Sequence, residues 1–327
     1  MIGKKKLHEY KLWFRPLKIS DGLLRTLKAR ADFFENLICS TTILYELERI
    51  LYTAPPPVYT DNLVASYSFD TNFTDYTGNN NLSANGNVVA GVNGGVVDDC
   101  ASFDGDADYA LAVDSDDFSF TDGVTDLPFS ISFWANFDTI SNTDPTYIMS
   151  KRAGGGDREW QIYFNIDGTV LIALGSDGNF ADYLLAKFIY TPTIGGTTWS
   201  HYTFVYSGSE TFSGIKMYLN GVSQTLTNSS AGTYLGMNNT TATVNVGTWG
   251  PSPTNYEFDG KIDELHVWKN RELTQAEVLD IYTTELGGTS ILPAATGLLA
   301  DYPNASAAYS LRNLIKCSFN CSYTNCL

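Results

Sequence analysis

The chain has 327 residues, of which 43% are hydrophobic and 13% aromatic; this composition supports a large buried core and excludes global disorder. Its formal net charge is −16, and because an acidic body repels phosphate backbones, we expect no nucleic-acid partner. No run reaches the roughly 18 apolar residues that cross a bilayer, and no apolar run follows the basic start as in a signal peptide.

The first part of the chain is basic, unlike the rest. Residues 1–58 hold 10 Lys or Arg and 6 Asp or Glu, a balance of +4, whereas the remainder carries −20. Apolar residues near i, i+3, i+4 spacing predict a helix over 21–52, capped by Ser20 or Asp21. Because such an apolar stripe has to be covered, we expect residues 1–53 to dock or oligomerise; the alternative is that the helix packs on its own body.

A proline run follows this helix. Pro55–Pro57 lack backbone donors and favour a stiff, extended connection, so residues 54–60 are interpreted as a linker. We therefore divide the chain into a helical anchor (1–53), this linker, a main domain (61–288) and a C-terminal tail (289–327).

The main domain changes from helical periodicity to alternation. Residues 160–166 alternate between apolar and polar, Asp167 and Gly168 supply a turn, and residues 169–174 continue the strand, which predicts a β-hairpin. The same alternation occurs over residues 129–133, 215–219 and 242–246. Roughly ten to twelve short strands with this spacing predict an all-β, two-sheet antiparallel sandwich. A capping box at 274–277 predicts one short helix.

The tail carries three of the five cysteines, Cys317, Cys321 and Cys326. An odd number without a signal peptide does not favour a secreted disulfide scaffold, and the spacing is not that of a zinc ribbon. We interpret the tail as a thiol-bearing segment that wraps the body or contacts a partner; a late disulfide or a metal clip is the alternative.

Seven segments of the main domain, in their order along the chain, carry a family resemblance. They are residues 63–70, 103–105, 129–134, 148–151, 199–201, 217–221 and 258–268. Together they resemble a laminin-G-like jelly roll of the concanavalin A-like lectin/glucanase superfamily, to which pentraxins are related. The resemblance implies two antiparallel sheets whose first and last strands are adjacent. It leaves function open, because this fold hosts lectins, adhesion modules, enzyme accessory domains and hydrolases.

Catalytic signatures are missing from the sequence. Glucanases of the resembled fold carry Glu-x-Asp-x-Glu or Glu-x-Asp-x-x-Glu on one strand, and neither pattern occurs. Asp263 and Glu264 are adjacent, so they should point to opposite faces of a strand. His201 matches the family's Trp-x-His position and is interpreted as structural. We therefore expect no enzyme; an accessory domain of a carbohydrate-active enzyme is the least favoured alternative.

Calcium is the cofactor that the resemblance suggests, because the fold often holds one such ion. Asp263 shares strand parity with Leu265 and Val267, so it should face the core, where a carboxylate needs a cation or several donors. Asp70 ends the first strand, the expected neighbour of the last. The two aspartates are therefore predicted to hold one structural Ca²⁺; hydrogen bonding of Asp263 to loop amides is the alternative.

Two loops offer side chains of the kinds that bind sugars. Trp249, Asn255 and Tyr256 combine aromatic faces with a planar amide, and Arg152 and Arg158 flank a glycine-rich loop. Both loops should lie at a rim of the sandwich. We predict these five residues to bind a ligand; for Trp249 the alternative is a hydrophobe that plugs its own loop.

These features predict a non-enzymatic glycan-binding or adhesion module displayed on a larger assembly. An extracellular-type domain without a signal peptide but with a short anchor resembles virion proteins such as phage fibre and decoration proteins, which are made in the cytoplasm. The predicted partners are other structural proteins of the assembly through residues 1–53, further copies of the chain, and a cell-surface glycan. The alternative is a purely structural fibre or decoration component without sugar binding.

Overall fold

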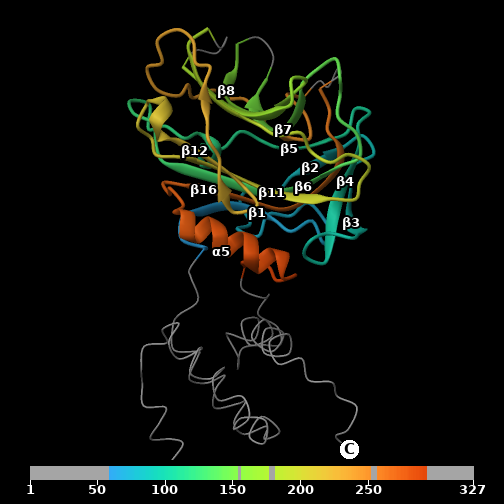
Figure 1. Ribbon diagram of the computed structural model, residues 1–327. Helices are drawn as coiled ribbons and strands as arrows, with labels where there is room; N and C mark the ends of the chain where they lie inside the picture. Colours follow the sequence, from blue (N-terminus) through green and yellow to red (C-terminus); the bar gives the residue numbers. More distant parts are fainter. Residues whose placement is uncertain (1–58, 154–155, 177–180, 252–255, 293–327) are drawn as a thin grey trace, which may run out of the picture. The chain divides into compact units, whose positions relative to one another are not determined.

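The computed structural model describes residues 59–153, 156–176, 181–251 and 256–292 (Figure 1). The predicted anchor helix, the proline run, Asn255 and the cysteines of the tail lie outside these ranges. Among the residues that the structure does describe, no helix has the length and apolar character needed to cross a membrane.

The described chain forms two antiparallel sheets stacked face to face, with one helix on the outer side of one sheet (Figure 1). This arrangement confirms the predicted sandwich. Sheet A has the order β13-β12-β11-β6-β16-β4-β3, with β1 also paired to β16. Its strands are β1 (Leu63–Tyr67), β3 (Val89–Asn93), β4 (Asp99–Asp104), β6 (Phe129–Phe137), β11 (Trp199–Tyr206), β12 (Ile215–Leu219), β13 (Val222–Ser223) and β16 (Asp259–Lys269).

Sheet B has the order β14-β10-β9-β8-β7-β15-β5-β2. Its strands are β2 (Ser83–Asn85), β5 (Tyr109–Ala112), β7 (Thr146–Arg152), β8 (Arg158–Asn165), β9 (Thr169–Gly175), β10 (Tyr183–Ile189), β14 (Thr227–Asn228) and β15 (Val244–Val246). The helices are the 3₁₀ turns η1 (Asp116–Phe118) and η2 (Phe212–Gly214) and the α-helix α5 (Gln275–Leu286). Sixteen strands in the described part exceed the ten to twelve expected, because several pair over only two or three residues.

Alternate side chains of the two sheets fill the space between them. Phe129, Ile131 and Phe133 of β6 are buried from one side. Trp160 and Ile162 of β8 are buried from the other, and the predicted β8–β9 hairpin is present with Asn165 opposite Thr169. Burying a large apolar side chain contributes roughly 1.5–3 kcal/mol, so this core holds the sheets together and leaves their outer faces for other contacts.

The first and last strands are neighbours, as the resemblance implied, and β16 changes partner midway. Its first residues, up to Ile262, pair with β4, and from Leu265 onward it pairs with β1. The register against β6 shifts between Asp263 and His266, and Glu264 adopts a φ of 44°. A β-bulge therefore lies at the point where the strand passes from one partner to the other.

This bulge overturns two expectations about β16. Asp263 is the cross-strand partner of Trp134. The indole N–H of Trp134 donates to Glu285 of α5, so both Trp134 and Asp263 lie on the outer face of sheet A. Leu265, by contrast, belongs to the core. Parity with Leu265 fails because the bulge adds one residue between them. Glu264 also lies on the outer side, where it contacts His266, so the two adjacent acids do not point to opposite faces.

Helix α5 covers part of the outer face of sheet A (Figure 1). Its predicted capping box is confirmed: the Thr274 side chain accepts from the Glu277 amide, and the Glu277 carboxylate accepts from the Thr274 amide. Val278 and Ile281 pack with Trp268 in a second, smaller core. Sheet A is therefore buried on both faces along this stretch, whereas no helix among the described residues lies on the outer face of sheet B.

Candidate functional site

The outer face of sheet B carries a cluster of aromatic rings around one arginine. Tyr147 of β7 and Tyr163 of β8 are cross-strand partners whose rings stack with centroids 4.9 Å apart. Tyr256 meets Tyr147 edge-on at 5.9 Å and Trp249 at 5.5 Å. These four residues and Arg152 are called the aromatic–arginine cluster below.

Arg152 ties the cluster together through two contacts. Its guanidinium carbon lies 3.8 Å from the centroid of the Trp249 ring, a cation–π geometry. Its Nη1 donates to Oε1 of Gln161 at 3.0 Å. Burial lowers the pKa of Arg152 to about 10, so the group stays a cation at neutral pH. A fixed positive charge thus sits on this face of an acidic protein.

Two donors of the cluster lack a partner. The indole N–H of Trp249 and the Nε–H of Arg152 are shielded from solvent, yet neither has a hydrogen-bond partner among the described residues. Buried polar groups in native proteins are normally paired. Unpaired donors beside aromatic faces match the requirements of a sugar, whose C–H faces stack on rings and whose hydroxyls accept hydrogen bonds.

The structure brings several of the predicted ligand-binding residues together. Trp249, Tyr256 and Arg152 share one cluster, and Arg158 lies opposite Arg152 in the β7–β8 register. Asn255 lies outside the described residues. Sequence reasoning missed Tyr147, Tyr163 and Gln161. For the last two the signal was present, because they alternate with core residues along β8 and must therefore face outward.

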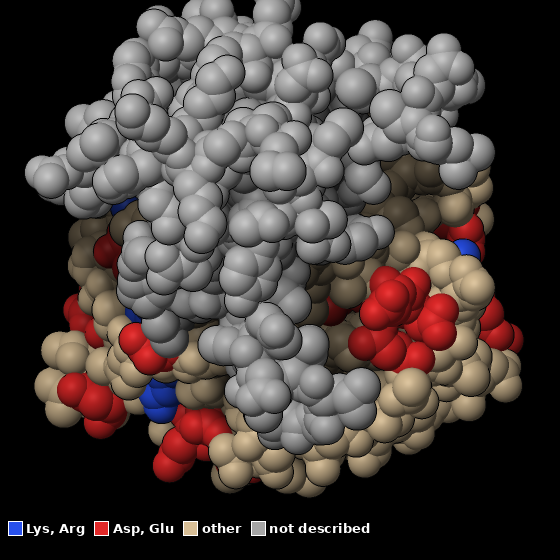
Figure 2. Space-filling model, turned by 90° about the horizontal axis from the view of Figure 1, so that it is seen from below, with Lys and Arg blue, Asp and Glu red and all other residues tan. Residues whose placement is uncertain are grey.

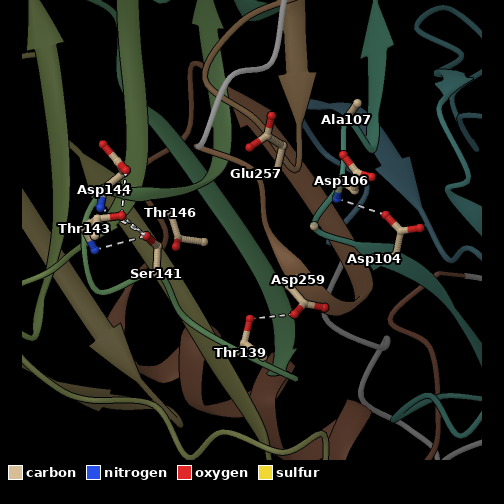
Figure 3. Close-up of a pocket in the computed structure, with 11 residues that line it drawn as sticks. Asp104, Asp106, Ala107, Thr139, Ser141, Thr143, Asp144, Thr146, Glu257 and Asp259 are labelled. Atoms are coloured by element: carbon tan, nitrogen blue, oxygen red, sulfur yellow. Dashed lines mark hydrogen bonds between the residues drawn. The ribbon is translucent and has the colours of Figure 1, made fainter.

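An acidic pocket of about 670 Å³ lies next to the cluster along the chain, since Thr146 precedes Tyr147 and Glu257 follows Tyr256 (Figure 3). It is lined by Asp104, Gly105, Asp106, Ala107, Thr139, Ser141, Thr143, Asp144, Thr146, Glu257 and Asp259. Sequence reasoning did not find this pocket, because its carboxylates come from three distant segments of the chain.

The hydrogen bonds of this pocket give no support to hydrolysis. Thr139 donates to Asp259 at 2.6 Å, and the amide of Asp106 donates to Asp104 at 3.0 Å (Figure 3). The Asp106 amide lowers the pKa of Asp104. A general acid for glycoside cleavage needs the opposite, a raised pKa that keeps its proton at neutral pH.

Asp70 and Asp263 both bind backbone amides of one segment. Oδ2 of Asp263 accepts from Val96 at 2.7 Å and from Val97 at 3.0 Å. Oδ1 of Asp70 accepts from Asp99 at 3.2 Å. Burial raises the pKa of Asp263 to about 8, and burial also raises the pKa of Asp70. The hydrogen bonds match the alternative stated for Asp263, and the calcium ion stays a prediction.

Sequence comparison identifies the family. Residues 104–279 match the family model of the concanavalin A-like lectin/glucanases superfamily, laminin-G type, and the chain belongs to this family. The match includes most of both sheets and reaches into α5. A search of curated proteins found no match.

Solved structures share the fold at low sequence identity. The binding domain of the Paraclostridial mosquitocidal protein 1 is 17% identical over 68% of this chain and 52% of that chain, with a TM-score of 0.51. The binding domain of botulinum neurotoxin DC, solved with rat synaptotagmin II, is 16% identical over 69% of this chain and 52% of the toxin chain, with a TM-score of 0.50. Domain 4 of the arabinanase AbnA from Geobacillus stearothermophilus, solved with arabinotriose, is 21% identical over 68% of this chain and 98% of the arabinanase domain, with a TM-score of 0.47. The chain spans about half the length of the toxin domains.

Proposed function

We propose that this chain is a non-enzymatic glycan-binding module and that the aromatic–arginine cluster on sheet B holds the sugar. The observation that carries the proposal is the pair of unpaired donors on Trp249 and Arg152 beside the rings of Tyr147 and Tyr256. Membership of a lectin/glucanase superfamily supports binding as the general role.

The rings and the guanidinium of the cluster are held in place before any ligand arrives, and a small movement of neighbouring side chains would expose the two shielded N–H groups. Arg152 holds the indole of Trp249 from one side, and Gln161 fixes the guanidinium. Side chains that are already held in place lose little conformational entropy on binding. A sugar ring stacks on the aromatic surface, while the indole and guanidinium N–H groups donate to its hydroxyls.

A glycan array of the full chain tests the proposal, followed by titration of the best ligand. Trp249→Ala should weaken binding about tenfold or more, equivalent to about 1.4 kcal/mol, because it removes both a ring and a donor. Tyr76→Ala is the control, since Tyr76 is 49% exposed and outside the cluster. Absence of binding to any glycan, or equal binding by the Trp249 variant, would refute the proposal. Repeating the array with a chelator tests the calcium ion predicted at Asp70 and Asp263.

The anchoring role is proposed from the sequence. We infer that residues 1–53 attach the module to other structural proteins of a larger assembly, such as the surface of a virion, and bring copies of the chain together. The basic balance of this segment and the proline run after it support the proposal. A chain that assembles in this way but binds no glycan would instead be a structural component of a fibre or decoration.

A further inference from the structure

A second group of polar side chains is buried between the outer face of sheet A and α5, away from sheet B. Glu264 and His266 come from β16, His201 from β11 and Glu285 from α5. All four are fully shielded from solvent. They are called the Glu–His cluster below. Sequence reasoning treated His201 as structural and linked none of the other three to it.

Three of the four residues of this cluster bring potential ligand atoms close together, and the fourth, His201, lies beside one of them. Nε2 of His266 lies 3.0 Å from Oε1 of Glu285 and 3.1 Å from Oε2 of Glu264. The atoms that these three residues offer all lie within 4.8 Å of one another. Nε2 of His201 lies 3.6 Å from Oε2 of Glu285. Two carboxylates and the imidazole of His266 therefore meet in one small volume, with the imidazole of His201 beside Glu285.

Neighbouring groups orient these side chains. The hydroxyl of Ser66 lies 2.8 Å from Nδ1 of His266, which leaves Nε2 directed at the carboxylates. The indole N–H of Trp134 donates to Oε2 of Glu285 at 2.7 Å, and the hydroxyl of Ser290 donates to Oε2 of Glu264 at 3.1 Å. Hydrogen bonds to the far side of a histidine and to a carboxylate are the usual support around a metal ligand.

Several polar atoms of the cluster lack a hydrogen-bond partner, and its two carboxylates need a compensating cation. Both ring nitrogens of His201 and Oε1 of Glu264 have no hydrogen-bond partner in the described part of the chain. A neutral imidazole carries a lone pair on one ring nitrogen, and that of His201 has no described hydrogen-bond partner. Two carboxylates buried together in a low-dielectric site are costly unless a cation compensates them.

We propose that the Glu–His cluster binds one zinc ion through His201, Glu264, His266 and Glu285. A Zn²⁺ ion would neutralise both carboxylates and use the lone pair of His201. Zinc bonds of about 2.0–2.1 Å in a tetrahedron place ligand atoms roughly 3.3 Å apart. Nε2 of His266 lies 3.0 Å from Oε1 of Glu285 and 3.1 Å from Oε2 of Glu264, close to that spacing. Nε2 of His201 lies 3.6 Å from the other oxygen of Glu285, so this carboxylate would have to turn slightly to present one oxygen to both imidazoles. Imidazole nitrogens favour zinc over calcium, which prefers oxygen ligands.

The proposed site is structural, because four protein ligands leave no open position for water. It joins two strands of sheet A to α5, so ion binding and docking of the helix stabilise one another. Since the cluster has no exposed atoms, we expect the ion to enter during folding, and native protein to release it slowly to a chelator.

The test is the zinc content of the full chain after refolding with a small excess of Zn²⁺ and removal of free metal, measured by mass spectrometry. We expect one zinc per chain in the wild type and its loss in His266→Gln and Glu285→Gln. Glu272→Gln is the matched control: it makes the same carboxylate-to-amide change on an exposed residue and should keep the ion. A combined Cys317→Ser, Cys321→Ser and Cys326→Ser variant should also keep it.

Three outcomes would overturn the proposal. They are a wild-type chain that binds no zinc, variants of the cluster that bind as much as the wild type, and binding that disappears only in the cysteine variant. If the cluster variants do not fold, the visible spectrum of the wild type refolded with Co²⁺ decides the question. Nitrogen and oxygen coordination without thiolate bands supports the site, and thiolate bands or an unchanged spectrum contradict it.

Discussion

At the scale of single residues, the contacts of Trp249 bear on two roles that its sequence left open. The indole borders Tyr256 of its own loop, as a plugging hydrophobe would, and it also lies against the guanidinium of Arg152 from β7, a contact that plugging does not require. Both neighbours were named among the predicted binding residues, but their mutual contacts depend on the register of β7 and β8. Residue types alone therefore indicated the candidate residues, and strand register determines which of them meet.

A buried ion pair near the end of sheet B provides a prediction about stability. Nζ of Lys151 lies 2.7 Å from Oε1 of Glu159, and both side chains are fully buried. Lys151→Met should lower the free energy of unfolding by about 3–5 kcal/mol, because it leaves the Glu159 carboxylate buried without its cation. Urea denaturation measures the difference.

The control for this prediction is the exposed pair of Lys216 and Glu272, whose side chains are 48% and 36% exposed. Lys216→Met should cost no more than about 1 kcal/mol, because solvent screens such a pair. Replacing both buried partners, in Lys151→Met with Glu159→Leu, should recover much of the loss. A cost for Lys151→Met as small as that for Lys216→Met would contradict the assignment.

At the scale of secondary-structure elements, β16 shows that the alternation of residues along a strand does not predict side-chain direction across a β-bulge. The family resemblance correctly predicted that this strand lies beside β1, but the bulge at Glu264 reversed the side that strand parity predicted for Asp263. The bulge arises where β16 leaves β4 and meets β1, and neither partner is visible in the sequence of β16 itself. The bulge also directs Glu264 toward His266, which builds the Glu–His cluster.

The turn between β12 and β13 supports α5, and this predicts an unequal effect of two glycine substitutions. Gly221 has a φ of +74°, and an added Cβ would lie 3.0 Å from Leu279 and 3.1 Å from Tyr282 of α5. Gly78 has a φ of +84° and nothing within 4 Å of such a Cβ. Gly78→Ala should lower the free energy of unfolding by about 1 kcal/mol from backbone strain alone. Gly221→Ala should lower it distinctly more, because the added Cβ also meets α5. Thermal unfolding measures the loss of stability in both variants. Equal losses would show that α5 does not pack tightly against this turn.

At the scale of the whole molecule, the acidic charge of the sequence is visible on the surface of the described residues. Acidic side chains form patches on the uncovered part of the face in Figure 2, in agreement with the net charge of −16. Helix α5 covers part of the outer face of sheet A, whereas none of the helices in the described part of the chain lies on the face of sheet B with the aromatic–arginine cluster. The proposed module therefore offers sheet B to a glycan.

The proposed anchor predicts self-association of the full chain. Light scattering should give a mass that is a multiple of 35.9 kDa. Replacing Leu23 and Leu27 by Glu should reduce this mass to that of a monomer, because the changes place charges on the predicted apolar stripe. A wild-type chain that is already monomeric would contradict self-association, although docking on a different protein would remain compatible with it.

Patterns that are local in the chain determined much of this protein in advance. Strand alternation, the Asp167-Gly168 turn and the Thr274 capping box depend on neighbouring residues, and the sandwich and α5 followed from them. The side on which Asp263 lies, the acidic pocket and the Glu–His cluster were decided only by the tertiary structure. They join residues from distant segments, and their contacts depend on strand register and on one bulge, which no single segment encodes.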